Sequence, residues 1–188
     1  MPNGSPAPSP GQIVLLNGTS SSGKSSIADE LVPLLDDTYF LMAVDAFNAM
    51  RSRDYPPEEL ELGLRRTRAG FHRAIAGMAT AGNNVIVDHV LSEPWRLADC
   101  LALFAGLDVV FVGVRCDLAE VNRRERQRGD RPVGLAAQQL AQVHAHGIYD
   151  LECDTTTTSA RDCALQLLEF LLTPKGPRAF ERLRAHEA

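Results

Sequence analysis

The feature that most constrains the fold of this chain is the segment Gly18-Thr-Ser-Ser-Ser-Gly23-Lys24-Ser25, which matches the pattern GxxxxGK[ST] in full. Its glycines let the backbone curl with N–H groups pointing inward, where they can bind phosphate oxygens. The pattern needs a buried strand before it and a helix after it, and the sequence predicts both, at 12–16 and at about 24–35. The alternative, a serine-rich loop that only caps a helix, does not require the complete pattern.

We therefore expect this phosphate-binding loop, the P-loop, to bind the phosphates of a nucleotide. Lys24 can reach the β- and γ-phosphates, and the Ser25 hydroxyl can ligate Mg²⁺. The positive end of the following helix dipole adds to the attraction. The predicted nucleotide-binding residues are those of the loop and the residue after it: Gly18, Thr19, Ser20, Ser21, Ser22, Gly23, Lys24, Ser25 and Ser26.

Apolar runs alternate with amphipathic segments along the rest of the chain. Further strands are predicted at 39–44, 84–88, 108–114 and 149–153, and further helices at 58–81, 94–104, 117–127, 135–146 and up to 172 after a cap at Thr158 or Ser159. Strands that are apolar on both faces and alternate with helices indicate a parallel sheet covered on two sides. The predicted fold is α/β, a three-layer P-loop kinase sandwich with a five-stranded parallel sheet.

The length of 188 residues suits a single domain. We predict a disordered N-terminal segment at 1–10, a P-loop kinase domain at 11–173, and a C-terminal tail at 174–188 that could form one short helix. The N-terminal segment lacks the features of a secretory signal, and no apolar run is long enough for a membrane span. The cysteines have no metal-ligand spacing, so we expect reduced core thiols in a cytoplasmic protein.

Two carboxylates are predicted at strand ends, where ligands bind in an open parallel sheet. Asp45 ends the second predicted strand and Asp88 the third, so both should point toward the P-loop. Asp88 could hold Mg²⁺, and Asp45 could accept the proton of an acceptor hydroxyl, acting as a catalytic base. The two roles could be exchanged, and either residue could instead cap a helix. His89, Glu93 and Trp95 could line the acceptor pocket or serve only the loop and the helix start.

Arginines are concentrated at 123–131, RRERQRGDR, between the fourth and fifth predicted strands. Phosphoryl transfer needs positive charge around the transferred oxygens, and small P-loop kinases carry it on a lid that closes over the nucleotide. We predict a small Arg-rich lid in which Arg128 and Arg131 act in catalysis with Lys24. A solvated helix face explains Arg123 and Arg126. The net charge of −5 and the lack of interleaved aromatic residues argue against nucleic-acid binding.

Together these segments resemble the chloramphenicol phosphotransferases from about Ile13 to Leu172. The matching pieces are LNGTSSSGKSSI, AVDAF, NVIVDHV, DVVFVGVRCD, RERQRGDR with the following Gly134, and YDLECDTT. The resemblance implies ATP-dependent phosphorylation of the primary 3-hydroxyl of chloramphenicol, which inactivates the antibiotic. It implies a general-base role for Asp45. It also assigns phosphate binding to Gly23, Lys24 and Ser25, and lid contacts to Arg128 and Arg131.

The chain departs from the family pattern on the acceptor side. Asp88-His89 stands where the family has paired acids, VLSEPW follows, and the segment from Met50 to Gly70 is divergent. These departures leave the acceptor open among chloramphenicol, related hydroxylated antibiotics, and hydroxylated metabolites or nucleosides. A nucleotide-binding regulatory protein with negligible turnover is the alternative of another class. The expected partner is a small hydroxylated molecule, with no nucleic acid and no membrane, and the oligomeric state is open.

Overall fold

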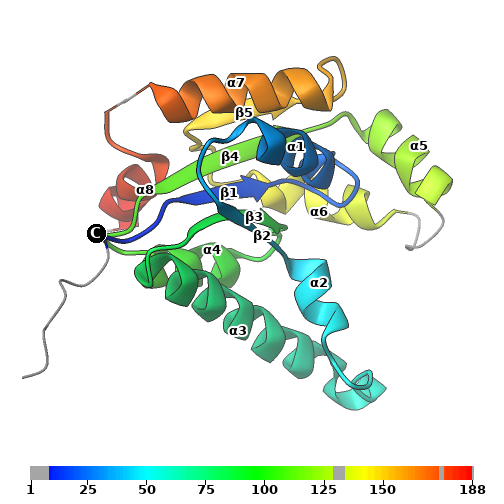
Figure 1. The fold of residues 1–188 in the computed structure, drawn as a ribbon. Helices are drawn as coiled ribbons and strands as arrows, with labels where there is room; N and C mark the ends of the chain where they lie inside the picture. Colours follow the sequence, from blue (N-terminus) through cyan, green and yellow to red (C-terminus); the bar gives the residue numbers. More distant parts are fainter. Residues whose placement is uncertain (1–8, 129–133, 174–175, 188) are drawn as a thin grey trace, which may run out of the picture.

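The computed structural model describes residues 9–128, 134–173 and 176–187, without the side chains of Arg128, Leu135, Ala136 and Glu187 (Figure 1). The strands are β1 (Ile13–Asn17), β2 (Tyr39–Ala43), β3 (Asn84–His89), β4 (Val109–Arg115) and β5 (Leu151–Asp154). The α-helices are α1 (Lys24–Leu31), α2 (Val44–Ala49), α3 (Leu60–Thr80), α4 (Pro94–Leu103), α5 (Leu118–Arg128), α6 (Leu135–Val143), α7 (Ala160–Leu172) and α8 (Ala179–Glu187). Two short 3-10 helices are η1 (Val32–Leu34) and η2 (Pro57–Glu59).

The strands form one parallel sheet in the order β2-β3-β1-β4-β5, which confirms the predicted five-stranded α/β fold. β1 lies at the centre, and its last residue, Asn17, is in register with His89 of β3 and Gly113 of β4. The carboxyl ends of the strands therefore meet at one edge of the sheet. Ligands bind beyond that edge in open parallel sheets.

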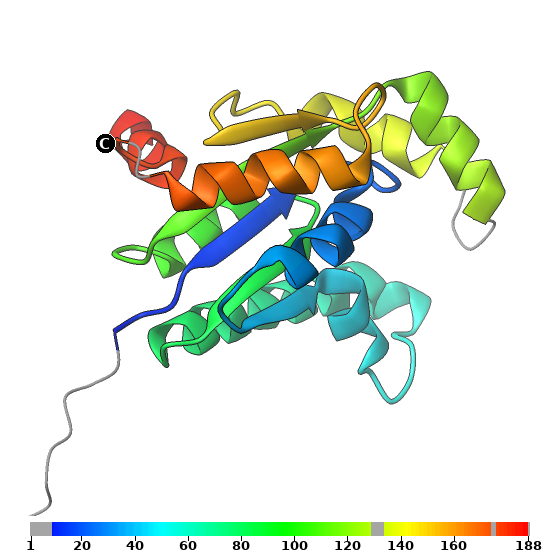
Figure 2. The same ribbon diagram turned by 45° about the horizontal axis from the view of Figure 1, so that its top comes forward.

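Helices cover both faces of the sheet (Figures 1 and 2). Successive β1 residues point to opposite faces, so Ile13 and Leu15 join one core and Val14 and Leu16 the other. The first core also holds side chains of α3, α4 and α8, and the second holds side chains of α1 and α7. Helices α1, α3, α4, α7 and α8 thus turn an apolar face to the sheet, and none of the described helices is long and apolar enough to cross a bilayer.

The second strand is shorter than predicted, because β2 ends at Ala43 and α2 begins at Val44. Asp45 is therefore in the first turn of a helix, and the prediction that it ends a strand is wrong. Ala43 keeps an extended conformation, with φ of −103° and ψ of 133°, and serves as the N-cap. A carboxylate in the first turn of a helix is stabilised by the helix dipole, which favours this early start.

The helix predicted at 135–146 is also shorter, because α6 ends at Val143. The prediction that His144 and His146 share a helix is therefore wrong, and both rings instead pack on Tyr149. The His144 Nδ1 atom lies 2.6 Å from the Tyr149 hydroxyl. Burial, reinforced by the positive charge of Arg115, lowers the pKa of His144 to about 4. His144 is consequently neutral at physiological pH.

Tyr149 also sets a steric limit on β4, because a Cβ atom added to Gly113 would lie 2.7 Å from its ring. That ring cannot move freely, since its hydroxyl accepts a hydrogen bond from Asn17 at 2.8 Å. We expect Gly113→Ala to lower the free energy of unfolding by about 1–3 kcal/mol through overpacking. Gly77→Ala is the matched control in α3, where nothing lies within 4 Å of an added Cβ.

Urea denaturation measures both changes. The control variant is expected to be more stable than wild type by up to about 1 kcal/mol, because alanine is the better helix former. Equal stability of Gly113→Ala and wild type would show that the Tyr149 ring yields and that the contact does not limit the strand.

Candidate active site

The P-loop connects β1 to α1 at the carboxyl edge of the sheet. Gly23 has a left-handed conformation, with φ of 97°, and Ser21 has φ of 58°. A side chain at position 23 would be strained by that φ, which explains the second glycine of the pattern. Of the predicted nucleotide-binding residues, five line the cavity described below, and the remaining four lie in the loop beneath it. The five are Ser21, Gly23, Lys24, Ser25 and Ser26, and the four are Gly18, Thr19, Ser20 and Ser22.

Lys24, Ser25 and Asp88 are brought together at this edge. The Lys24 side chain is nearly buried, and its Nζ donates a hydrogen bond to the Thr19 carbonyl at 2.7 Å. The same Nζ lies 3.6 Å from Asp88 Oδ1, and the Ser25 hydroxyl donates to Asp88 Oδ2 at 2.5 Å. The residue pair predicted to hold Mg²⁺ is thus in direct contact, with the lysine ammonium beside it.

Two buried hydroxyls make the P-loop suitable for a phosphate. The Ser21 and Ser22 Oγ atoms are buried and have no hydrogen-bond partner in the described part of the chain. A buried hydroxyl without a partner is destabilising, by about 1–3 kcal/mol. Phosphate oxygens placed in the loop would accept from such hydroxyls. The chemistry of the loop therefore fits the phosphates of a nucleotide.

The oxygen atoms of Ser25 and Asp88 fit Mg²⁺, which prefers hard oxygen ligands. Within the described ranges, no group of three or more His, Cys, Asp or Glu residues is arranged to hold a metal. Magnesium in phosphoryl transfer is typically held by one or two protein groups, the substrate phosphates and water. A single serine–carboxylate pair beside the P-loop is the donor set that this mode of binding needs.

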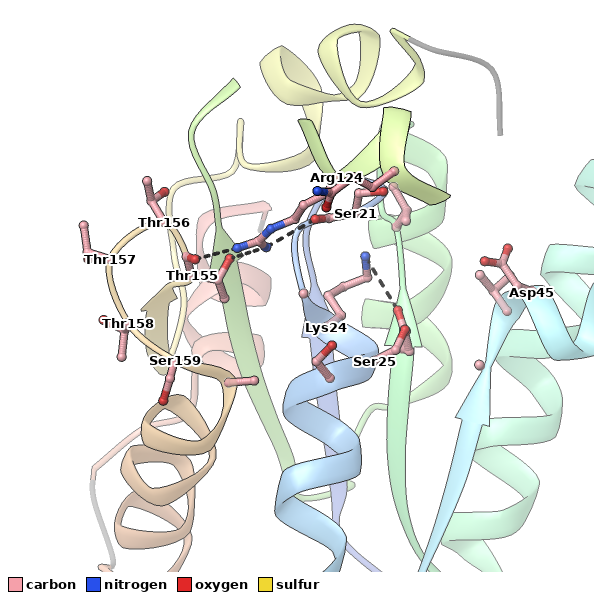
Figure 3. A pocket seen from close by; sticks show the side chains of 18 residues that line it. Ser21, Lys24, Ser25, Asp45, Arg124, Thr155, Thr156, Thr157, Thr158 and Ser159 are labelled. Atoms are coloured by element: carbon pink, nitrogen blue, oxygen red, sulfur yellow. Dashed lines mark hydrogen bonds and ion pairs between the residues drawn. The ribbon is translucent and has the colours of Figure 1, made fainter. Parts of the chain in front are cut away.

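A cavity of about 600 Å³ opens over the P-loop and reaches Asp45 (Figure 3). Figure 3 shows Asp45 at the start of α2 on one side of the site and Thr155 to Ser159 on the other, with Lys24 and Ser25 of α1 between them. Ala43 and Val44 line the cavity next to Asp45. Although Asp45 belongs to a helix instead of a strand end, it faces the same space as Lys24 and Asp88.

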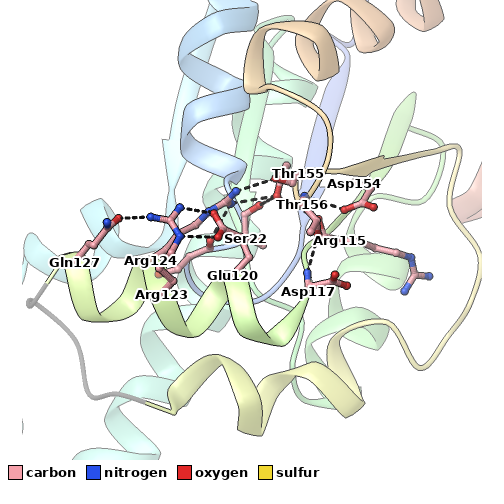
Figure 4. A network of polar contacts seen from close by, with 11 residues as sticks. Ser22, Arg115, Asp117, Glu120, Arg123, Arg124, Gln127, Asp154, Thr155 and Thr156 are labelled. Carbon is pink, nitrogen blue, oxygen red and sulfur yellow. Dashed lines mark hydrogen bonds and ion pairs between the residues drawn. The ribbon is translucent and has the colours of Figure 1, made fainter.

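The far wall of the cavity is formed by residues 155–160, which follow β5. Thr155 ties this segment to the P-loop, because its hydroxyl donates to the Ser22 carbonyl at 2.6 Å. Arg124 of α5 joins them, because its Nη2 donates to the Thr155 carbonyl at 2.8 Å (Figure 4). Its Nη1 lies 3.4 Å from the Ser21 carbonyl (Figure 3). Glu120 orients the guanidinium by accepting from Nε at 2.8 Å.

Arg124 is a site residue that the sequence reasoning missed. The sequence predicts a lid in the arginine-rich segment, with Arg128 and Arg131 as its catalytic residues because they flank the pair Gly129-Asp130. The signal was available in the sequence, since Arg124 stands in the same arginine-rich run between the fourth and fifth predicted strands. Arg131 and the side chain of Arg128 lie outside the described residues, and the predicted lid contacts stay a prediction. Arg123, expected on a solvated face, pairs with Glu120.

Asn17 joins the floor of the site to both sides. Its fully buried side chain donates to the Val143 carbonyl and to the Tyr149 hydroxyl, each at 2.8 Å. Its Oδ1 accepts from the Leu91 backbone N–H at 2.9 Å. Through Asn17, the residue just before the P-loop is fixed to the end of α6 and to the loop after β3.

The α4 side of the site contains a buried histidine pair. His72 Nδ1 lies 2.7 Å from Asp99 Oδ2, and His72 Nε2 lies 2.9 Å from His89 Nε2. Burial lowers the pKa of both histidines, with His89 also affected by the neighbouring His72. Because the carboxylate can only accept, neutral His72 donates to Asp99 and accepts from His89. His89 is almost fully buried, so it supports the site from behind and does not line the open cavity.

Glu93 and Trp95, at the start of α4, contact each other instead of standing free. The Trp95 indole N–H donates to Glu93 at 2.7 Å, and Arg96 forms an ion pair with the same carboxylate. Arg96 also donates to the Val90 carbonyl at 2.8 Å, and Val90 lines the cavity. The beginning of α4 is thereby attached to the rim of the site.

Residues 11–172 match the family model described as chloramphenicol phosphotransferase-like protein. Two strains of Mycobacterium tuberculosis, CDC 1551 / Oshkosh and ATCC 25618 / H37Rv, each encode a relative provisionally named an O-phosphotransferase. Each is 32% identical over 204 residues, a match that spans 93% of this chain and 88% of the relative.

Solved structures share the fold at low sequence identity. The APS kinase of Mycobacterium tuberculosis, solved in complex with AMPPNP and APS, has a TM-score of 0.65 and 20% identity over 88% of this chain and 100% of that chain. The tunicamycin resistance protein of Deinococcus radiodurans has a TM-score of 0.65 and 19% identity over 89% of this chain and 99% of that chain. At these identities the structures show the fold of the kinases, and the acceptor has to be argued from the site.

Proposed function

The chain belongs to the family of chloramphenicol phosphotransferase-like proteins and is a phosphotransferase, and we propose that it moves the γ-phosphoryl group of ATP, with Mg²⁺, onto a hydroxyl of a small molecule. Chloramphenicol and related hydroxylated antibiotics are the first candidate acceptors, in which case the reaction would confer resistance. The observation that carries the proposal is one cavity that joins the P-loop, Lys24 and Asp88 to the carboxylate of Asp45.

The phosphates of the nucleotide would lie in the P-loop, where the Ser21 and Ser22 hydroxyls need partners. The Ser25 hydroxyl and Asp88, which are in contact, would hold Mg²⁺, and the ion would neutralise negative charge on the nucleotide phosphates. The Lys24 ammonium, beside Asp88, stabilises the negative charge that develops on the transferred group. Arg124 and the 155–160 segment supply the wall for the nucleoside end.

The acceptor would enter from the side of α2, where Asp45 faces the P-loop across the cavity. Asp45 accepts the proton of the attacking hydroxyl, which makes the oxygen a better nucleophile as its bond to phosphorus forms. The proton comes off the oxygen in the same step, so no charge accumulates on the acceptor. A carboxylate on this side is what a general base requires, and it supports transferase activity over nucleotide binding alone.

The test is an ADP-release assay with Mg²⁺-ATP and a panel of hydroxylated acceptors, with each product identified by mass spectrometry. The panel contains chloramphenicol and tunicamycin, and shikimate, gluconate and a nucleoside represent primary metabolism. We expect acceptor-dependent ADP release with a phosphorylated product for at least one member. Tight ATP binding without ADP release on any acceptor would instead support a nucleotide-binding regulatory protein and would contradict the proposal.

A further inference from the structure

The side of the site beyond Asp45 carries four arginines that the proposed reaction does not use. Arg51 follows α2, Arg65 and Arg68 are on α3, and Arg96 is on α4. We refer to them as the arginine wall. They come together because α3 packs against both α2 and α4. The four arginines therefore stand on neighbouring segments near Asp45, whose charge acts on Arg68.

The contacts within the wall show that its members are close to one another. The Arg65 guanidinium stacks on the Trp95 ring, 4.5 Å from its centroid, and the Arg96 guanidinium lies 6.0 Å from the same centroid. Arg68 is electrostatically coupled to Arg51, Arg96, Glu93 and Asp45. Arg68 thus lies between the candidate base and the start of α4.

The wall has more positive charge than its surroundings neutralise. Glu93 pairs with Arg96, and Asp54, which is almost fully exposed, pairs with Arg51 at 3.3 Å. For Arg65 and Arg68 the described residues provide no ion pair. Burial lowers the pKa of Arg68 against the raising effects of Glu93 and Asp45, and it lowers the pKa of Arg96 against the raising effect of Glu93. Arg65 stays exposed, whereas Arg68 has lost part of its water without gaining an ion pair among the described residues, which is unfavourable unless an anion completes the site.

Several buried N–H groups of the wall have no acceptor. The Arg51 Nε and Nη1 atoms and the Arg96 Nε atom are buried and have no hydrogen-bond partner among the described residues. Arginine presents its donors in a rigid fork that matches the oxygens of a carboxylate or a phosphate. A carboxylate or a phosphate would accept hydrogen bonds from these buried guanidinium N–H groups, which have no other acceptor among the described residues.

We propose that the arginine wall binds an oxyanion, a carboxylate or a phosphate ester, carried by the hydroxylated acceptor. This inference rests on the proposed function, since it assigns the wall to the acceptor of that reaction, and it names the acceptor class. Chloramphenicol carries no ionised group, so the preferred acceptor is an anionic alcohol. The oxyanion held by Arg68 and its neighbours would orient the molecule so that a hydroxyl reaches Asp45.

The first experiment measures binding without turnover. Trp95, the single tryptophan of the chain, lies under Arg65 and reports on the wall by its fluorescence. The P-loop is first saturated with Mg²⁺-ADP, and sulfate or acetate is then added at ionic strength held constant with chloride. We expect a saturable fluorescence change with at least one of the two anions. In Arg68→Gln the dissociation constant should rise about tenfold or more, because a charged hydrogen-bonding partner is lost.

Arg66→Gln is the matched control, because Arg66 is an exposed arginine on the same helix. It should bind the anion like wild type, and Arg68→Lys should recover part of the affinity. Unchanged melting temperatures show that all variants are folded. No saturable change in wild type, or equal dissociation constants for wild type and Arg68→Gln, would overturn the proposal.

The second experiment uses matched pairs of acceptors in the ADP-release assay. Shikimate and its methyl ester test a carboxylate, and glycerol 3-phosphate and glycerol test a phosphate ester. The anionic member of at least one pair should have a KM about tenfold lower, and Arg68→Gln should remove that difference. Equal KM values within both pairs would overturn the inference. Anion binding at the wall in a protein without turnover on any acceptor would leave the inference standing and contradict the proposed function alone.

Discussion

Asp45→Asn is expected to lower kcat about a thousandfold while leaving the KM for ATP nearly unchanged. A general base contributes about 10²- to 10⁴-fold to such a reaction, and the amide cannot take the proton of the attacking hydroxyl. Asparagine keeps the size of the side chain, so the cavity between α2 and the P-loop is preserved. Steady-state kinetics at saturating Mg²⁺-ATP, with the acceptor identified from the panel, measure the effect.

Asp37→Asn is the matched control, because Asp37 is an exposed carboxylate at the opposite end of β2. It should retain wild-type kcat and KM. A magnesium titration separates the roles of the two site carboxylates. If excess Mg²⁺ restored the activity of Asp45→Asn, Asp45 would be a metal ligand, and the base would have to be sought elsewhere.

Lys24→Met is expected to lower kcat about 100- to 1,000-fold, because it removes a positive charge from the position where negative charge develops in the transition state. Methionine fills nearly the same volume in this buried position, but it cannot donate to the Thr19 carbonyl or pair with Asp88. ATP binding should weaken as well. The rise in melting temperature that Mg²⁺-ATP gives the wild-type protein should therefore become smaller in the variant.

Lys24→Arg is the companion variant, because it keeps the charge while changing the shape of the donor. It should retain more activity than Lys24→Met. Circular dichroism establishes that both variants are folded. Wild-type kcat in Lys24→Met would contradict the placement of the γ-phosphate beside this lysine.

The local parts of the fold were predictable from the sequence. The P-loop pattern, the strand before it and the helix after it depend on residues that are neighbours in the chain, and the structure has them within a few residues of the predicted bounds. The parallel sheet follows from apolar runs that alternate with helices, and it is confirmed. Asp88 was predicted near the P-loop for the same reason, since strand ends meet at one edge.

The parts that depend on packing between distant segments were not predictable. Val44 has the branched side chain of a strand residue, so the pattern extended β2 over the true start of α2. The Asp99–His72–His89 chain joins residues from three elements whose contact no local pattern records. The arginine wall was not predictable for a related reason, because its members belong to α3, α4 and the loop after α2, and only Arg65 and Arg68 are close in sequence.

The Asn17 side chain, with its three hydrogen bonds, has a consequence for how such a protein can diverge. A substitution there would disturb the floor beneath the phosphates together with the loop after β3 and the end of α6. A substitution of Asn17 therefore changes the P-loop, the loop after β3 and the end of α6 together. The arginines of the acceptor side stand on α3, on α4 and just after α2, outside this junction, and can be exchanged one at a time. We expect related enzymes to keep the phosphate donor and to acquire new acceptors by changes in α2, α3 and α4.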